Sequence, residues 1–532
     1  MKTSLFCLAI ILLAGTGFAQ IVDWQWANHI STNYSEYSSD MVTDNSGNSY
    51  VTGYFFLTVN IGPFTLTSQG SQDIYIAKTD AAGNWLWAIR AGGAGAETPL
   101  KLALDDSGNL YLSGYFDGAA VFGSSTLNCA GVYDLFVAKL SSSGTWQWAT
   151  RAGGTLYDTA ECLALDSAGN IYVGGYFEIA ASFGSTNLTS AGGNDLYVAK
   201  LNSSGSWQWA KRGGGPGYDL VTSISVDGSG NCYATGTYRG TSSFGTTNLT
   251  CPGTQDLFVI KLSSSGNWLW AKGTATTTWA YNTGIVTDSA GNCYLSGMFA
   301  GSVTLGSQTL VSAGSADILV GKIDSDGNWL WSTKAGGSST DRGDFITLDN
   351  FGNILVAGYF YGTAEIAGTT LISNGQMDVF VAKLSGTGDW KWSRQAGGPS
   401  YDYCSGLTYV NGGHILISGF FQNSITIGNQ TLHNPTTGYT DVFVAGLQET
   451  ALPLAPQNPV ITRVGNDLVL NWDATSLDTN GQTIVPNGYT VYWRDSVTGI
   501  HQTVQTQSNT WTHTDAALQP IRLYHITAVK EN

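Results

Sequence analysis

Short runs in which apolar and polar residues alternate recur along most of this 532-residue chain. In one stretch the runs are 100–105, 110–116, 134–140 and 145–151. Alternation with a period of two is typical of β-strands, because successive side chains point to opposite faces. The links 105–109 and 141–144 each carry a glycine at the fourth position, which supplies the positive φ of a hairpin turn. We therefore expect antiparallel hairpins throughout.

This pattern returns with a step of 61 residues, and its clearest marker is a Trp-x-Trp pair that occurs seven times. A fixed long period indicates one supersecondary unit copied in tandem. Both indoles of a pair face the same side of a strand, as sugar-stacking platforms or as packing between units. The periodicity favours a structural role, since each buried ring contributes up to ~5 kcal/mol before entropy is counted. The pairs are Trp24 and Trp26, Trp85 and Trp87, Trp146 and Trp148, Trp207 and Trp209, Trp268 and Trp270, Trp329 and Trp331, and Trp390 and Trp392.

Four antiparallel strands repeated seven times predict an all-β fold, a seven-bladed β-propeller. The two ends of the repeat region fit this architecture. The region begins with Trp24-Gln25-Trp26, which is the fourth strand of a unit without strands one to three. It ends at 441–445, which is the third strand of a unit without a fourth. We expect the propeller to comprise residues 20–447, with the N-terminal strand completing the last blade. Closure in this way leaves no exposed strand edge.

Three motifs follow one another in the repeats: Asp-x-x-Gly-Asn-x-Tyr-Val-x-Gly-Tyr, Asp-x-Phe-Val-Ala-Lys-Leu and Gly-x-Trp-x-Trp. In order, spacing and copy number they resemble the SBBP repeat of bacterial exported proteins, a family named for a seven-bladed β-propeller. The resemblance covers about residues 21–447. It implies that fold and an extracytoplasmic address, and it implies no defined activity.

The chain changes character after the repeats. Residues 448–459 carry Pro453, Pro456 and Pro459 and are predicted to be a stiff linker. Residues 460–532 resemble a fibronectin type III module, a small β-sandwich, with Trp472 in the second strand and 489–492 in the third. Leu518-Gln519-Pro520 before Tyr524 matches the tyrosine-corner region. The module is expected to be abbreviated, without its usual last strand.

Residues 1–19 have the features of a secretory signal peptide: Lys2, an apolar stretch at 5–14 and a small-x-small cleavage site ending at Ala19. No later stretch is apolar enough to span a membrane. We therefore expect a secreted or cell-surface protein that is monomeric. The net charge of −16 disfavours nucleic acid and anionic lipid as partners, because both are negatively charged.

Two further residue types are expected to be structural. The Asp-x-x-Gly-Asn turns resemble calcium loops but lack the additional oxygen ligands, and the turn aspartate is expected to pair with the lysine that ends strand three. The seventh copy loses both, at Val410 and Gly446. The cysteines after the signal peptide are expected to be mostly unpaired and buried, and Cys232–Cys251 is the most feasible bridge because both lie in one unit.

The main candidate for ligand binding is an acidic residue before each first strand, with Ala280 as the one exception. Because first strands are innermost in a propeller, these carboxylates would ring one mouth of a central channel. They could bind a cation such as calcium or, with the adjacent aromatic residues, a glycan. Alternatively, each carboxylate caps backbone N–H groups of the adjoining Gly-Gly loop. The candidate residues are Glu36, Glu97, Asp158, Asp219, Asp341, Asp402, Tyr157, Tyr218, Trp279 and Tyr401.

No catalytic residues can be assigned. The six histidines form no metal-binding motif, and no nucleophile elbow or phosphate-binding loop occurs. Equivalent acids in a ring also lack the two distinct environments that general acid and base catalysis needs. We therefore predict an exported, non-enzymatic binding or surface-scaffold protein without a cofactor other than such a cation, which recognises an extracellular protein or glycan. The alternative is a propeller enzyme that acts on extracellular polysaccharide.

Overall fold

The structure is a computed structural model that describes residues 21–32, 34–436, 438–450, 457–464, 467–473, 488–495, 501–507, 510–513 and 522–529. The predicted signal peptide lies outside these residues. Every regular element among them is a β-strand. The chain divides into two compact units, Trp24–Leu447 and a second that includes Gln448–Asn532. Each unit is described by itself.

The larger unit consists of antiparallel sheets in which four strands follow one another in sequence order. Successive sheets comprise β2 (Glu36–Thr43), β3 (Ser49–Phe55), β6 (Asp73–Thr79) and β7 (Trp85–Ala91); β8 (Glu97–Leu104), β9 (Leu110–Phe116), β12 (Asp134–Leu140) and β13 (Trp146–Gly154); and β14 (Asp158–Leu165), β15 (Ile171–Phe183), β16 (Thr186–Leu201) and β17 (Trp207–Gly213). They continue with β18 (Leu220–Val226), β19 (Cys232–Tyr238), β22 (Asp256–Leu262) and β23 (Trp268–Gly273); β25 (Trp279–Thr287), β26 (Cys293–Ala300), β29 (Asp317–Ile323) and β30 (Trp329–Gly337); and β31 (Asp341–Leu348), β32 (Ile354–Ile366), β33 (Thr369–Leu384) and β34 (Trp390–Ala396). The last sheet has the order β35 (Asp402–Val410), β36 (His414–Gln422), β39 (Thr440–Thr450) and β1 (Ile21–Ile30).

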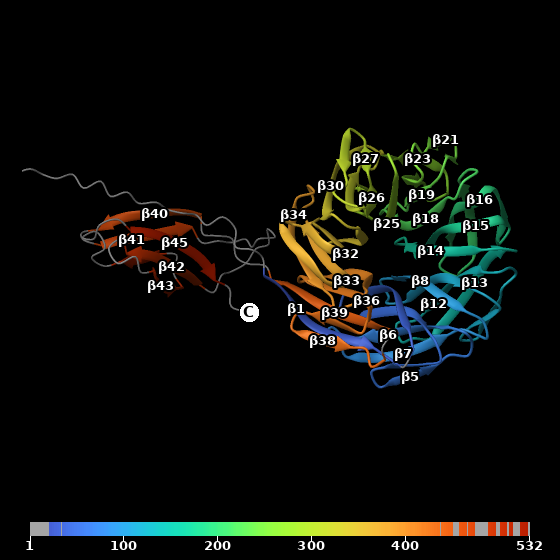
Figure 1. Cartoon of the computed structure of the whole chain (residues 1–532), viewed down its shortest axis with the longest axis horizontal. Coiled ribbons are helices and arrows are strands. Elements are labelled where there is room, and N and C mark those ends of the chain that lie inside the picture. Colours follow the sequence, from blue (N-terminus) through green and yellow to red (C-terminus); the bar gives the residue numbers. More distant parts are fainter. Residues whose placement is uncertain are drawn as a thin grey trace, which may run out of the picture. The chain divides into compact units, whose positions relative to one another are not determined.

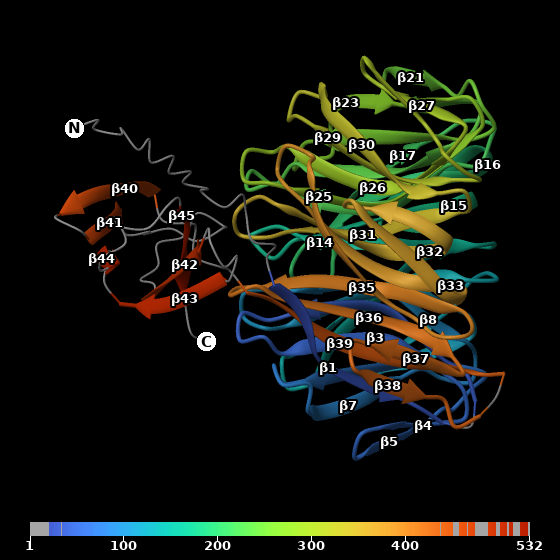
Figure 2. The same ribbon diagram turned by 60° about the vertical axis from the view of Figure 1, so that its left-hand side comes forward.

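These sheets form a propeller-like ring (Figure 1). The first strand of each sheet packs against the first strand of the next, in the cycle β2, β8, β14, β18, β25, β31 and β35, and β35 packs against β2 again. The ring is completed by the pairing of β1 with β39, which lie side by side in Figure 2. The strand at the start of the region thus provides the outermost strand of the last sheet.

The connection between the second and third strands is itself a hairpin. In the second sheet β10 (Ala119–Phe122) pairs with β11 (Ser125–Asn128), and Gly123 turns between them with φ of 61°. Corresponding hairpins are β4 (Thr58–Ile61) with β5 (Phe64–Thr67), β20 (Thr241–Phe244) with β21 (Thr247–Thr250), β27 (Ser302–Leu305) with β28 (Gln308–Val311), and β37 (Ser424–Ile427) with β38 (Gln430–His433). The short β24 (Ala275–Thr276) pairs with β27.

Each first strand carries one extra residue relative to the second strand, a β-bulge near its centre. In the third unit the extra residue is Glu161, because Ala160 pairs with Gly175 and Cys162 with Gly174. The glycine that recurs in the second strand lies against this first strand. A Cβ on Gly114 would approach the Thr98 carbonyl oxygen to 2.0 Å, so no other residue fits there without displacing the backbone. The bulge changes the direction of a side chain relative to the regular alternation of the strand.

The tryptophan pairs pack within and between sheets. Trp146 lies 5.1 Å from Phe122 of the β10–β11 hairpin, and Trp148 lies 6.2 Å from Tyr111, measured between ring centroids. Trp209 donates its indole N–H to the carbonyl oxygen of Ser264 in the next unit, at 3.2 Å. The rings therefore link neighbouring sheets by contact and by hydrogen bonding.

The second unit contains two three-stranded sheets, β40 (Gln457–Val464), β41 (Asp467–Asp473) and β44 (Thr510–His513), and β43 (His501–Thr506), β42 (Gly488–Asp495) and β45 (Arg522–Val529). Trp472 lies in β41 and Tyr489 in β42, and 518–520 lie outside the described residues. The predicted linker 448–459 overlaps the end of β39 and the start of β40. Pro459 is accommodated because β40 is an edge strand whose register shifts between Gln457 and Val460.

Candidate functional site

The predicted acidic residues all lie at the start of, or directly before, a first strand, and all are fully buried. Five of them accept a hydrogen bond from the second glycine of the Gly-Gly loop. For example, Gly154 N–H donates to Asp158 Oδ2 at 2.7 Å, and Gly398 N–H donates to Asp402 Oδ2 at 2.7 Å. Gly93, Gly215 and Gly337 donate in the same way to Glu97, Asp219 and Asp341. These contacts are the ones expected if each carboxylate caps backbone N–H groups of the adjoining Gly-Gly loop. The carboxylates do not face solvent.

Burial makes these carboxyl groups retain protons. Desolvation raises the pKa of Glu36, Glu97 and Asp402 to about 8 and that of Asp158 and Asp341 to about 7, and it also raises the pKa of Asp219. In each case a second carboxylate nearby raises the pKa further, while a hydrogen bond to the carboxylate lowers it.

That second carboxylate belongs to the aspartate that opens the Asp-x-Phe-Val-type motif in the third strand of the preceding sheet. A Cβ on Gly153 would lie within 3.0 Å of both Asp134 and Asp158, so the two carboxyl groups flank the same glycine. We call this meeting place of two sheets a junction. At four junctions a base from the fourth strand binds the aspartate: Arg90 with Asp73, Arg151 with Asp134, Arg212 with Asp195, and Lys334 with Asp317.

At the exception, Ala280, acid and base are lost together. At the junction that contains Ala280, Gly273 occupies the position of the base. The aspartate there, Asp256, is instead bound by the Thr274 hydroxyl and the Thr276 N–H, both at 3.0 Å from Oδ1. Neutral donors therefore replace the ion pair where the second carboxylate is missing. At the junction of Asp378 and Asp402 the base alone is missing, since Gln395 occupies its position, so acid and base are not always lost together.

The predicted loop aromatics are the exposed part of the candidate set. Tyr157, Tyr218 and Tyr401 are 40%, 56% and 42% exposed, and Trp279 is half-buried. Isolated bridges pair Tyr157 with Tyr133, Trp279 with Gln255 and Tyr401 with Met377, so these loops lie beside the segments that lead into the third strands. The structure thus places the aromatics on the surface and the carboxylates beneath it.

A cluster that the sequence analysis missed lies on the first and second strands. The Arg342 guanidinium carbon is 4.8 Å from the Tyr281 ring centroid and 6.0 Å from that of Tyr359. Ring centroids continue from Tyr359 to Tyr403 at 4.8 Å and from Tyr403 to Phe420 at 5.0 Å. The series then runs from Phe420 to Tyr37 at 5.2 Å and from Tyr37 to Tyr54 at 5.0 Å. We call Tyr37, Tyr54, Tyr281, Arg342, Tyr359, Tyr403 and Phe420 the inner aromatic cluster.

This inner aromatic cluster breaks the repeat. Tyr37, Tyr281, Arg342 and Tyr403 each follow the residue at the acid position, and the remaining units have Thr98, Thr159 and Leu220 there. All cluster members except the 6%-exposed Tyr359 are half-buried, so part of each side chain remains accessible. The residue directly after the acid position varies between units, whereas the residues around it repeat. This variation is the sequence signal from which the cluster could have been identified.

Charged residues lie below the cluster on the same strands. Arg342 Nε pairs with Asp344, and Lys101 Nζ lies 3.2 Å from Asp40 Oδ1. Lys101 also lies 4.9 Å from the Phe345 ring centroid, although β8 and β31 are not neighbours in the ring, so these side chains meet across its centre. Glu161 has no ion-pair partner among the described residues, and burial raises its pKa.

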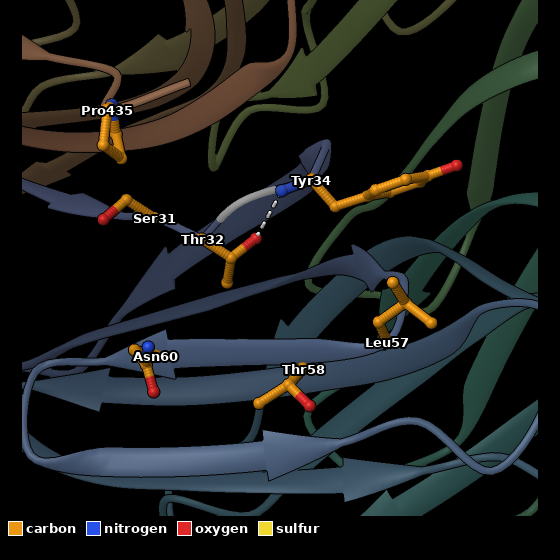
Figure 3. A pocket seen from close by; sticks show the side chains of 7 residues that line it. All are labelled: Ser31, Thr32, Tyr34, Leu57, Thr58, Asn60 and Pro435. Atoms are coloured by element: carbon orange, nitrogen blue, oxygen red, sulfur yellow. Dashed lines mark hydrogen bonds between the residues drawn. The ribbon is translucent and has the colours of Figure 1, made fainter.

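Two pockets lie at positions where the repeat changes. One, of about 480 Å³, lies beside the closing strand and is lined by Ser31, Thr32, Tyr34, Leu57, Thr58, Asn60 and Pro435 (Figure 3). The other, of about 540 Å³, lies next to Gly273 and is lined also by Lys272, Thr274, Ala275, Thr304, Gly306, Gly327, Asn328 and Trp329. Ser31-Thr32 and Ala275-Thr276 stand where other units have Gly-Gly.

Other predicted features are placed as follows. Four turn aspartates form an ion pair with the strand-three lysine, as at Lys139–Asp105 (3.7 Å) and Lys383–Asp349 (2.9 Å), which confirms the expected pairing in these units. The cysteines of the described region are free, including Cys232 and Cys251. The described residues contain no group of three or more His, Cys, Asp or Glu side chains placed to hold a metal. No helix in this part of the chain is long and apolar enough to cross a membrane.

Comparison with known proteins supports the repeat. Residues 147–176 match the SBBP β-propeller repeat model. The chain is a β-propeller repeat protein. It is 24% identical over 453 residues to an uncharacterised WD repeat-containing protein of Acanthamoeba polyphaga mimivirus, covering 68% of this chain and 32% of that protein. It is 27% identical over 361 residues to the regulatory protein FlaEY of Caulobacter vibrioides, covering 62% of this chain and 37% of that protein.

This β-propeller repeat protein spans about a third of the length of those two relatives. Among solved structures, the quinohemoprotein alcohol dehydrogenase from Comamonas testosteroni is 11% identical with a TM-score of 0.40, over 83% of this chain and 78% of that chain. A similarity at that level carries no argument about activity.

Proposed function

We propose that this protein is an exported, non-enzymatic binding or surface-scaffold component built on seven blades. The cycle of first strands and the pairing of β1 with β39 support a closed propeller. The strand orders β40-β41-β44 and β43-β42-β45 support a fibronectin type III-like module after it, because two small sheets of this kind make up such a module. Residues 1–19 supply the export signal in this proposal.

The single observation that carries the binding role is the inner aromatic cluster. A purely architectural residue would repeat with the unit, whereas Tyr37, Tyr281, Arg342 and Tyr403 replace the Thr98, Thr159 and Leu220 of other units. Partly exposed tyrosines provide a flat apolar face and a hydroxyl, which is the combination that protein and glycan binding surfaces use. Arg342 is paired with Asp344, so the cluster presents little net charge.

The cluster lies at the end of the first strands where the loops from the fourth strands arrive, since Tyr37 and Tyr403 directly follow Glu36 and Asp402. We propose that Tyr157, Tyr218, Trp279 and Tyr401 on these loops form the rim of the same surface. The buried carboxylates hold the loops and do not touch the ligand. The ligand is an extracellular protein or a neutral glycan, because a protein of charge −16 repels polyanions.

The test is a screen of purified 20–532 against glycan and secreted-protein arrays, followed by affinity measurements on two variants. Tyr37→Thr with Tyr403→Thr installs the residue that other units carry at this position, so the fold should persist. We expect the affinity for the identified ligand to fall at least tenfold. The control is Phe351→Ala, an exposed aromatic on the turn between β31 and β32.

Two results would contradict the proposal. Unchanged binding by the double variant together with reduced binding by the Phe351 variant would place recognition on the opposite turns. Release of sugar from a polysaccharide on the array would favour the alternative, a propeller enzyme that acts on extracellular polysaccharide.

A further inference from the structure

The junction that closes the ring contains two buried carboxyl groups and differs from the others in what surrounds them. Glu36 begins β2 and Asp441 lies in β39, and both are fully buried. They are held close because the Thr440 hydroxyl donates to the Glu36 carbonyl oxygen at 3.1 Å, and Asp441 contributes to the raised pKa of Glu36. Neither oxygen of Asp441, nor Oε2 of Glu36, has a hydrogen-bond partner in the described part of the chain.

The other junctions show what is missing. Where the third residue after the Trp-x-Trp pair is basic, it binds the strand-three aspartate, as Arg151 binds Asp134. The residue at this position in β1 is His29, which forms no ion pair among the described residues and whose pKa is lowered by burial. At the Ala280 junction the second carboxylate is absent, so no cation is needed. The closing junction retains both carboxylates without the base, as does the junction of Asp378 and Asp402, where Gln395 stands at the base position. The two differ because Asp378 Oδ2 accepts the Asn374 N–H at 3.0 Å, whereas neither oxygen of Asp441 has a partner among the described residues.

The pocket beside β1 is adjacent to this junction through Thr32, although Glu36 and Asp441 are themselves buried. Thr32, which lines the pocket, donates its hydroxyl to Glu36 Oε1 and accepts the Tyr34 N–H at 3.0 Å, the bond drawn in Figure 3. The other units have Gly-Gly at the positions of Ser31 and Thr32, except the unit with Ala275-Thr276. The side chains that open the pocket therefore add hydroxyl oxygens next to the unpaired carboxylates.

We propose that the closing junction binds a calcium ion between Glu36 and Asp441, where the ion replaces the basic side chain of the internal junctions. The ligands available there are carboxylate, hydroxyl and main-chain oxygens, which are hard donors. Calcium accepts about six to eight such oxygens in irregular arrangements and can include water, whereas magnesium requires a smaller and more regular set. Two carboxylates also match the double charge of the ion, so binding leaves the junction neutral.

The experiment uses the purified mature protein, freed of metal with chelator and measured by thermal unfolding and terbium luminescence. Calcium at millimolar concentration should raise the melting temperature by about 3 °C, since a ligand at about 100 times its Kd stabilises by RT ln(1 + [L]/Kd). Magnesium at the same concentration should give less than half this shift. Terbium should show luminescence sensitised by nearby aromatic residues, and calcium should displace it.

Two variants separate the proposed site from other calcium effects. Glu36→Gln with Asp441→Asn keeps the shape of the protonated pair and should abolish both the melting shift and the terbium signal. His29→Arg restores the base of the internal junctions, so it should raise the melting temperature of the metal-free protein and remove the response to calcium. A calcium response that persists in the glutamine–asparagine variant would overturn the proposal, as would no response in the unmutated protein.

The pH dependence gives an independent check. Calcium competes with protons for the oxygens of Glu36 and Asp441, because a carboxyl group must be ionised to hold the ion. Calcium affinity should therefore increase about tenfold or more between pH 6 and pH 8, with proton release on binding. An affinity that does not depend on pH would place the ion at exposed carboxylates elsewhere and contradict the assignment.

Discussion

The closing junction and the junction between β12 and β14 perform the same structural task with different contacts. At the internal junction the chain runs continuously from β13 through Gly153-Gly154 into β14, and Arg151 neutralises Asp134. At the closing junction Ser31-Thr32 likewise follow β1 and precede β2, but β1 belongs to the last sheet although it comes from the start of the repeat region. There β1 pairs with β39, Ala27 N–H donates to Gln430 Oε1 at 3.0 Å, and no base contacts Asp441 among the described residues.

The comparison separates what the copied unit needs from what the closed ring needs. Every junction keeps the strand-three aspartate, but the group that binds this aspartate varies. It is an arginine, a lysine or a hydroxyl group at different junctions, and no base contacts Asp441 among the described residues. The last sheet alone contains a strand, β1, that comes from the opposite end of the repeat region and joins the sheet only by pairing with β39. Four internal junctions carry an ion pair to the strand-three aspartate, whereas the last sheet depends on the pairing of β1 with β39.

The largest effect should follow from deleting residues 21–30, which removes β1 and leaves β39 as an exposed edge. Unpaired edges associate with other chains, so the truncated protein should aggregate or lose more than about 10 °C in melting temperature. Differential scanning calorimetry and size-exclusion chromatography check this. A soluble truncated monomer with an unchanged melting temperature would show that closure does not depend on β1.

The next largest effect should come from Arg151→Gln, which breaks the ion pair at an internal junction. Removing one partner leaves Asp134 buried without its cation, and because Arg151 is 38% exposed we expect a loss of about 2 kcal/mol in the free energy of unfolding. The variant Arg151→Gln with Asp158→Asn removes the second carboxylate as well. At pH 8 it should recover part of the loss in chemical denaturation. Equal losses in both variants would exclude charge balance as the cause.

The stability of the whole ring should decrease as pH rises from about 5 to about 8. The pKa values of Glu36, Glu97 and Asp402 are about 8 when folded, and those of Asp158, Asp341 and Asp441 are about 7. In the unfolded chain the values are about 4. The folded state therefore holds more protons in this window, and the free energy of unfolding falls as they are lost. Melting curves at several pH values test this, and Asp402→Asn should reduce the slope.

The smallest effect should come from the turn ion pairs, which do not belong to any junction. Lys139→Met removes the partner of Asp105 at 3.7 Å, with both side chains partly exposed, and should cost about 1 kcal/mol or less. Lys383→Met should cost more, because Lys383 and Asp349 are both almost fully buried. Urea denaturation of the two variants checks the order. A larger loss at Lys139 would show that burial does not set the strength of these pairs.

The strands and their repeat were predictable because they depend on local patterns. The expected run 110–116 coincides with β9, and 134–140 coincides with β12. The β10–β11 hairpin was missed although its signals, Phe122 followed by Gly123 and then Leu127, recur in the sequence. Its strands are only four residues long, too short for alternation to show.

The candidate site could be predicted only in part, since the sequence does not show which side of a strand meets solvent. A carboxylate at Asp158 is compatible with both a channel mouth and a loop cap, and its complete burial decides between these positions. The role of Tyr403 was hidden for another reason. Its neighbours Tyr359 and Phe420 are brought to it by the pairing of separate strands, and no spacing in the sequence encodes their contact.

The pairing of β1 with β39 also constrains the order of events during biosynthesis. Ser35 and Thr440 bond across 405 residues, and Ala27 and Gln430 across 403, so the first strand made has no partner until the last sheet exists. Sheets made early can acquire their local hairpins while the chain is still emerging, but the ring stays open meanwhile. In an exported chain, β1 would emerge on the far side of the membrane unpaired. If this protein is exported as proposed, its secretion should depend on holdase chaperones in that compartment more strongly than secretion of a protein whose sheets are all built from consecutive strands.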